Sequence, residues 1–178
     1  SFRLQTPDGR DEVLRSLGIA RVDRLVFNEA LTAMTPHAFV EFLFGRHAGL
    51  AQIHVGDDFR FGHGRVGDTA LLHSLCEPRG VSVVVHAAVM HLAESISSSR
   101  VRAALRVAEM SLVEALIGRP YTIDGTILPG HGRGRVLGVP TLNLYPEDRL
   151  LPAHGVYVAT IRSGMQTLPA VDRKSTRL

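Results

Sequence analysis

Apolar positions between residues 11 and 118 follow two alternating patterns. Helical spacing is found in four segments: 11–17, the segment opened by Thr35 and Pro36, the segment after Asp68, and 99–117. Short runs rich in branched apolar residues, typical of strands, lie between them at 22–27, 51–55 and 81–85. Because strand and helix alternate, the pattern predicts an α/β domain with a doubly wound parallel sheet. The 81–85 strand is expected to be buried on both faces.

Local signals mark the helix ends and the buried helix faces. Thr35 before Pro36 is an N-cap pattern, and Asp68 is expected to cap the next helix. The predicted core positions of these two helices are Phe39, Val40 and Leu43, and Leu71, Leu72 and Leu75. The strongest helix, 99–117, has its apolar side at Val101, Leu105, Ala108, Leu112 and Leu116. Gly118 and Pro120 are expected to end it.

The pattern changes after Gly118. The segments 121–128, 141–144 and 155–162 are strand-like, glycine and proline separate them, and helical spacing is not found. The sequence therefore predicts a second, β-rich domain that begins between Gly118 and Tyr121.

Residues 130–143 form a glycine-rich segment inside this β domain. Gly130, Gly132 and Gly134 alternate with basic side chains, and such a loop can form a nest of backbone N–H groups for phosphate oxygens. Thr141 and Asn143 would share one face of a strand and offer the oxygen ligands that Mg²⁺ accepts. The segment lacks the Gly-Lys-Ser/Thr ending of a P-loop, and Pro140 opposes the helix of a dinucleotide fingerprint. From this segment alone, a Gly/Arg surface turn is the alternative.

A second candidate anion site lies where the 99–117 helix is expected to begin. Ser97, Ser98 and Ser99 precede Arg102 by one helical turn, and a helix N-terminus with hydroxyls and arginine favours phosphate. Plain capping by Ser98 or Ser99 is the alternative. The glycine-rich loop 56–68 also follows a strand, and ligands of doubly wound sheets bind at the carboxyl ends of strands.

Composition limits the other function classes. The chain has 178 residues, of which 45% are hydrophobic, so one ordinary domain or two small ones can form a packed core. Apolar runs are too short for a membrane span, the N-terminus lacks signal-peptide organisation, and Cys76 is a single cysteine, which together favour the cytoplasm. We expect no membrane partner, and the sequence does not define the oligomeric state. The scattered histidines, including His131 and His154, do not have the spacing of a metal site.

The basic charge is concentrated in the tail, residues 172–178. These carry three of the basic residues and one acidic residue, so without them the net charge of +3 falls to +1. A nucleic-acid partner is therefore not expected. The tail resembles a translated adaptor sequence, so we expect the natural protein to continue differently after about Val171.

Three segments in order resemble the prokaryotic bifunctional riboflavin kinase/FMN adenylyltransferases (FAD synthetases). They are 55–62, 96–102 and 134–143, with a Leu-Ile-Gly-Arg-Pro-Tyr junction at 116–121. The resemblance implies an FMN adenylyltransferase domain at 1–118 that lacks its first strand, an incomplete riboflavin kinase β-barrel at 119–171 and a foreign tail at 172–178. It also implies ATP, riboflavin and FMN as substrates, Mg²⁺ as cofactor, and synthesis of FMN and then FAD.

The resemblance assigns site residues position by position. The flavin would meet Asp58, Phe59, Phe61 and Gly62, although core packing is the alternative for one of the two phenylalanines. Ser97, Ser98, Ser99 and Arg102 would hold the ATP phosphates in adenylyl transfer, with Ser99 in place of the family's threonine. In the kinase, Gly130, Gly132, Gly134, Arg135 and Gly138 would cover ATP, and Thr141 and Asn143 would hold Mg²⁺.

Two family elements are not found among the 178 residues. They are a Gly-x-Phe-Asp-Gly-x-His-x-Gly-His strand segment and the catalytic glutamate of the kinase. The sequence is therefore expected to be a fragment, inactive in both reactions, of a protein that performs both. The alternatives are a nucleotidyltransferase for another cofactor, which would leave 130–143 unexplained, and a nucleic-acid-binding protein, which the charge disfavours.

Overall fold

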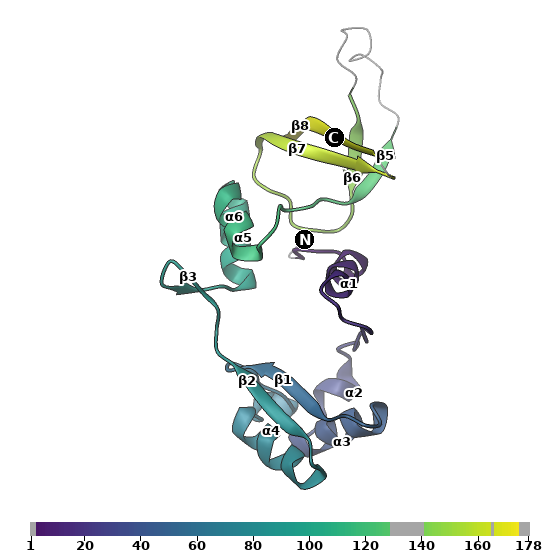
Figure 1. The fold of residues 1–178 in the computed structure, drawn as a ribbon, viewed down its shortest axis with the longest axis vertical. Coiled ribbons are helices and arrows are strands. Elements are labelled where there is room, and N and C mark those ends of the chain that lie inside the picture. Colours follow the sequence, from purple (N-terminus) through teal and green to yellow (C-terminus); the bar gives the residue numbers. More distant parts are fainter. Residues whose placement is uncertain (1–2, 129–140, 165, 175–178) are drawn as a thin grey trace. The chain divides into compact units, whose positions relative to one another are not determined.

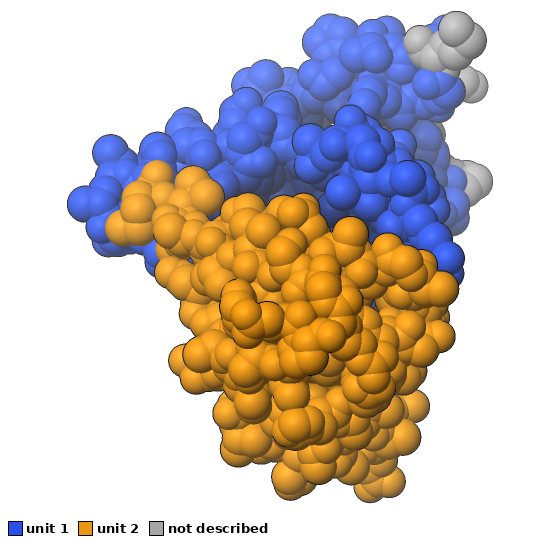
Figure 2. Space-filling model, turned by 60° about the horizontal axis from the view of Figure 1, so that its bottom comes forward, with its two compact units in different colours: residues 1–22, 91–178 blue, residues 23–90 orange. Residues whose placement is uncertain are grey.

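A computed structural model describes residues 3–128, 141–164 and 166–174. The chain forms two compact units, coloured separately in Figure 2. Unit 1 comprises Ser1–Val22 and His91–Leu178, and unit 2 comprises Asp23–Met90. Unit 2 is therefore an insertion in the sequence of unit 1. No helix in the described part of the chain is long and apolar enough to cross a membrane.

Unit 2 contains a parallel pair of strands with helices packed against it. Its elements are α2 (Glu29–Thr32), α3 (Pro36–Arg46), β1 (Gln52–Gly56), α4 (Thr69–Cys76) and β2 (Ser82–His86), with 3₁₀ turns at His63–Arg65 and Glu77–Arg79 (Figure 1). β1 pairs with β2 in parallel, with Ile53 opposite Val83. The predicted parallel pairing is confirmed, although the sheet of unit 2 contains only these two strands among the described residues.

Both predicted caps in unit 2 are confirmed. The Thr35 hydroxyl accepts a hydrogen bond from the Ala38 amide at 3.2 Å, and Asp68 Oδ1 accepts one from the Leu71 amide at 2.8 Å. The buried core cluster consists of Val40, Phe61, Leu72, Cys76 and Val81. The half-buried side chains that pack around it include Phe39, Leu71 and Leu75, as the helical spacing predicted.

Two strand predictions in unit 2 are wrong. Residues 22–27 form no strand, and the Phe27 side chain is 84% exposed. A branched apolar run becomes a strand only when a neighbouring strand pairs with it, and none of the described strands does so. β2 is not buried on both faces, because Val85 is half-exposed. In β1 the burial alternates, so only the face with Ile53 and Val55 meets the core.

The described helices of unit 1 are α1 (Pro7–Ser16), α5 (Ser98–Arg106) and α6 (Met110–Ile117). A short hairpin of β3 (Met90–His91) and β4 (Glu94–Ser95) begins at the last residue of unit 2 and precedes α5. α1 begins earlier than the predicted 11–17, because Thr6 caps it by accepting from the Gly9 amide at 3.1 Å. Its Thr6-Pro7 signal is the same as that of Thr35 and Pro36.

The single helix predicted over 99–117 is wrong. The chain breaks between α5 and α6, where Ala108 adopts a positive φ of 60°. The break lets the two short helices pack against each other and share one buried cluster, which is Val101, Ala104, Leu105, Val113 and Leu116. Helical spacing persists on both sides of the break, so periodicity alone did not reveal it.

The remainder of unit 1 is β-rich, as predicted. β5 (Gly125–Leu128) pairs antiparallel with β6 (Asn143–Pro146), and β7 (Gly155–Ser163) pairs antiparallel with β8 (Gln166–Lys174). The 155–162 strand is confirmed, whereas 121–128 is shorter than predicted. β8 was not predicted, because Pro169 is unusual within a strand. The described strands after residue 118 form two separate pairs and do not close into a barrel.

Candidate active site

The predicted flavin-contacting residues lie on the loop that leaves β1 in unit 2. Phe61 is buried and forms backbone hydrogen bonds with Gly67 in both directions, at 3.1 and 2.9 Å. A Cβ atom on Gly67 would lie 2.8 Å from the Phe61 ring, so the ring fills the space over this glycine. The core-packing alternative therefore describes Phe61.

Phe59 and Asp58 lie nearer the surface of the same loop. Phe59 is half-buried, and its ring stacks on the Phe61 ring with centroids 5.6 Å apart and an interplanar angle of 16°. Asp58 is exposed. The φ of Gly62 is +74°, and a Cβ there would lie 2.7 Å from Pro36 Cγ, so only glycine fits. Of the four predicted residues, Asp58 is exposed, Phe59 and Gly62 are half-buried, and Gly62 shapes the loop.

The predicted phosphate-binding serines begin α5 in unit 1. The N-cap is Ser97, whose hydroxyl accepts a hydrogen bond from the Arg100 amide at 3.2 Å. The alternative interpretation, that Ser98 or Ser99 caps the helix, is therefore wrong. Both lie in the first turn with exposed side chains, and Arg102 is half-buried one turn further on. The start of α5 combines the positive end of the helix dipole with two exposed hydroxyl groups.

The flavin loop belongs to unit 2, and the start of α5 belongs to unit 1. The kinase residues fall partly outside the described part of the chain: Gly130, Gly132, Gly134, Arg135 and Gly138 lie in 129–140. Thr141 and Asn143 are described and exposed. Asn143 is the first residue of β6, opposite Leu128, and Thr141 precedes the strand. Their side-chain oxygens are accessible and of the type that Mg²⁺ accepts.

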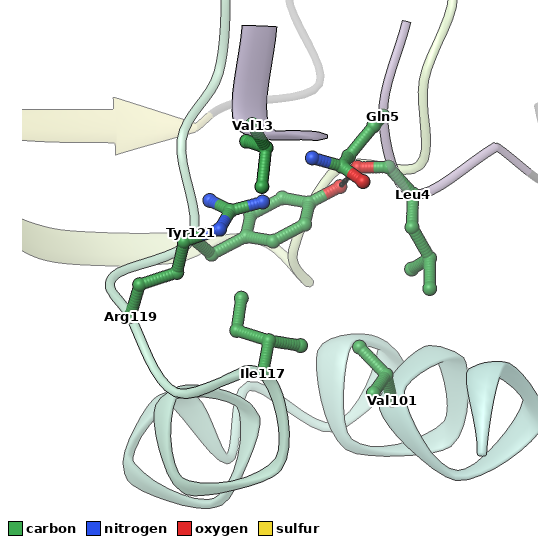
Figure 3. A pocket seen from close by; sticks show the side chains of 7 residues that line it. All are labelled: Leu4, Gln5, Val13, Val101, Ile117, Arg119 and Tyr121. Atoms are coloured by element: carbon green, nitrogen blue, oxygen red, sulfur yellow. Dashed lines mark hydrogen bonds between the residues drawn. The ribbon is translucent and has the colours of Figure 1, made fainter. Parts of the chain in front are cut away.

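Unit 1 also contains a cavity of about 200 Å³ that the sequence did not predict (Figure 3). It is lined by Leu4, Gln5, Val13, Val101, Ile117, Arg119 and Tyr121. The Tyr121 hydroxyl lies within hydrogen-bond distance of two carbonyl oxygens, 3.0 Å from that of Leu4 and 2.6 Å from that of Leu150. Burial raises the pKa of Tyr121, and the charges of Arg149 and Arg119 partly oppose this. None of the predicted site residues lines this cavity.

Arg149 is a second feature that the sequence did not indicate. Its side chain is only 2% exposed. It donates to the Thr122 carbonyl and forms an ion pair with Asp124, and its Nη2 lies 3.5 Å from the Thr6 hydroxyl. Arg149 therefore links the cap of α1 to the segment before β5. Arg149 follows two acidic residues, and such a sequence is typical of a charged surface turn.

Comparison with known protein families accounts for both parts of the chain. The FAD synthetase model matches residues 1–100, and the riboflavin kinase model matches residues 117–177. The two matches place the chain in the class of proteins that join an FAD synthetase region to a riboflavin kinase region. The chain belongs to the FAD synthetase family, and a riboflavin kinase region follows the FAD synthetase region in sequence.

Curated relatives combine the same two activities in their names. The bifunctional riboflavin kinase/FMN adenylyltransferase of Pseudomonas fluorescens is 36% identical over 160 residues, which is 90% of this chain and 51% of the relative. That of Escherichia coli K12 is 35% identical over 170 residues, covering 93% of this chain and 54% of the relative. The chain therefore spans about half the length of the curated relatives it matches.

A solved structure shares the fold. The crystal structure of a macrolide-efflux protein from Streptococcus pneumoniae matches with a TM-score of 0.83 and 25% sequence identity. The match covers 96% of this chain and 55% of that one. The efflux role is stated in the name of that protein only, and the two chains share a fold.

Proposed function

We propose that this chain is part of a bifunctional enzyme that phosphorylates riboflavin to FMN and adenylylates FMN to FAD. The observation that carries the proposal is the order of the two family matches along one chain, FAD synthetase first and riboflavin kinase second. Of the predicted motifs, 55–62 and 134–143 fall within the matched regions, and 96–102 overlaps the end of the first one. Both reactions transfer phosphorus-containing groups, so positioning and charge neutralisation account for most of the catalysis. The substrates would be ATP, riboflavin and FMN, and the compartment the cytoplasm.

In the adenylyl transfer, Asp58 and Phe59 would contact the flavin while Phe61 and Gly62 support the loop beneath them. The half-buried aromatic ring of Phe59 suits the flat isoalloxazine. Ser97, Ser98, Ser99 and Arg102 would hold the ATP phosphates. The exposed hydroxyls of Ser98 and Ser99 at a helix N-terminus support this role.

In the kinase reaction, Thr141 and Asn143 would hold Mg²⁺ beside the phosphates of ATP. Their exposed oxygen atoms fit a hard cation that keeps several waters. A bound Mg²⁺ would neutralise charge on the transferred phosphoryl group. The glycines of 130–138, with Arg135, would cover the nucleotide.

We propose a module boundary at residues 118–119. The riboflavin kinase match begins at residue 117, close to this boundary, and Gly118 ends α6 in the left-handed conformation with φ +71°. That residues 172–178 are foreign to the natural protein stays a prediction, which sequencing of the parent gene checks. In this chain β8 continues through Lys174.

The test is a product assay. The chain is incubated with riboflavin, ATP and Mg²⁺, and fluorescent flavins are separated by chromatography. A longer protein that adds the histidine segment and the kinase glutamate is expected to form both FMN and FAD. The 178-residue chain alone is expected to form neither above the blank without enzyme. Absence of both products with the longer protein would refute the proposal, and FMN or FAD from the chain alone would refute its inactivity.

A further inference from the structure

Arg100 occupies an unusual position at the start of α5. It lies in the first turn, where the helix dipole disfavours a positive charge. Nevertheless its side chain is only 16% exposed. Its Nη1 donates to the His91 carbonyl at 2.9 Å and to the Glu94 carbonyl at 3.1 Å, and its Nε lies 3.0 Å from a Glu94 carboxylate oxygen. The guanidinium is therefore bonded to the hairpin that precedes the helix.

This hairpin has a strained turn. The two residues between β3 and β4 are Leu92 and Ala93, with φ of 51° and 62°. Two-residue turns with positive φ at both positions normally contain asparagine or glycine, because a Cβ atom is unfavourable there. Leu92 is also exposed, so its side chain gains little from packing. Such a conformation persists only when surrounding contacts impose it. The bonds from Arg100 are contacts of this kind.

The same residue fixes the chain between the hairpin and the helix. The Arg100 amide donates to the Ser97 hydroxyl at 3.2 Å, while its side chain holds His91 and Glu94. Ile96, between these points, packs against the buried cluster of α5 and α6. Arg100 thus bonds to both ends of the segment 91–97. The conformation of this segment determines where the first turn of α5, with Ser98 and Ser99, begins.

We propose that Arg100 is a positioning residue for the phosphate site. It holds residues 91–97 in the conformation that presents Ser98 and Ser99 to a phosphate group, and it does not itself bind phosphate. The proposal rests on the proposed function of the α5 start in adenylyl transfer. It predicts that loss of the guanidinium loosens the hairpin and weakens phosphate binding while the body of α5 stays folded.

The experiment uses the 178-residue chain and four variants. Arg100→Met removes the donors but keeps an unbranched stem. Arg100→Lys is the conservative variant, because a single nitrogen, Nη1, makes both carbonyl bonds and an ammonium group can replace it. Glu94→Gln removes the exposed partner charge. Arg106→Met is the matched control, because Arg106 is exposed at the other end of α5.

Two quantities are measured for each variant. Hydrogen exchange followed by mass spectrometry gives the protection of 91–97 and of 103–106. Calorimetric titration with inorganic pyrophosphate and Mg²⁺ gives the affinity of the phosphate site. For Arg100→Met we expect exchange in 91–97 to accelerate about tenfold and pyrophosphate affinity to fall about tenfold, because charge-assisted hydrogen bonds are lost. Exchange in 103–106 should not change.

The other variants separate positioning from general stability. Arg100→Lys should restore most of the protection and affinity, and Glu94→Gln and Arg106→Met should stay within about twofold of the wild type, as exposed charges contribute little. Unchanged exchange in 91–97, or unchanged pyrophosphate affinity in Arg100→Met, would overturn the positioning role while leaving the proposed function intact. If the wild-type chain binds no pyrophosphate, the proposed phosphate site itself is wrong.

Discussion

Replacing Arg149 by methionine should destabilise unit 1 by about 2 kcal/mol. The substitution removes the donor of the Thr122 carbonyl and the partner of Asp124. A hydrogen bond involving a charged group contributes about 1.5–3 kcal/mol. The Asp124 side chain is 46% exposed, so water replaces the guanidinium there and its loss adds only about 0–1 kcal/mol. Methionine also avoids the desolvation cost of the buried guanidinium, and this offsets part of the lost stability. Methionine fills much of the space of the arginine stem, which limits the cavity term.

Tyrosine fluorescence gives a probe of unit 1 alone. The chain has no tryptophan, and its three tyrosines, Tyr121, Tyr145 and Tyr157, all belong to unit 1. With a urea dependence of about 2 kcal/mol per molar, a loss of about 2 kcal/mol lowers the unfolding midpoint by about 1 M. The measurement is a urea titration of wild type and variant at pH 7.

Two further variants decide whether the network is the cause. Arg149→Lys keeps the charge but supplies one nitrogen where Nη1 and Nη2 serve different acceptors, so its midpoint should be intermediate. Arg162→Met removes an exposed arginine of β7 and should leave the midpoint unchanged. If Arg149→Met shifts the midpoint no more than Arg162→Met does, the reasoning from burial and hydrogen bonding is refuted.

Three further predictions concern single residues. Ala108→Gly should stabilise unit 1 by about 1 kcal/mol in the same urea titration, because glycine relieves the positive φ between α5 and α6; a destabilised variant would contradict this. Burial raises the pKa of Cys76, so the thiol should react with a disulfide reagent at pH 8 only when unit 2 opens, and fast labelling of the native chain would disagree. Because the folded pKa of Tyr121 is raised, its stabilising contribution is full below pH 10 and declines above it. Above pH 10, Tyr121→Phe should therefore lose less stability than the wild type, as followed by circular dichroism. Identical pH profiles of the two proteins would count against the raised pKa of Tyr121.

Local signals in the sequence predicted the features that depend on neighbouring residues. Thr35 and Asp68 cap helices through amides three residues away, so each cap is encoded within one turn. The alternation of strand and helix predicted the parallel pairing of β1 with β2. The glycine-rich loop was predicted as a site, and the structure adds that Gly62 and Gly67 are required by packing.

Features that depend on distant contacts could not be predicted. Arg149 is buried because Thr6, 143 residues earlier in the sequence, packs beside it. The turn at Ala108 is favoured by packing of α6 against α5, which periodicity does not register. The run 22–27 has the composition of a strand, but none of the described strands pairs with it. Composition alone does not show whether a partner strand is present. The role of Arg100 likewise depends on which carbonyl groups its side chain reaches.

The insertion of unit 2 into unit 1 has a consequence for synthesis on the ribosome. The segment before α1 has its partners, Tyr121, Arg149 and Leu150, far along the sequence, with Tyr121 lying 117 residues after Leu4 and Arg149 lying 143 residues after Thr6. At about 5–20 residues per second, the 143 residues between Thr6 and Arg149 take roughly 7–30 s to be added. Unit 2 is complete well before then and can fold first. Closure of unit 1 is thus a late step, and a ribosome that stalls before residue 149 leaves residues 3–6 without Arg149 and Leu150, and so accessible to proteases and chaperones.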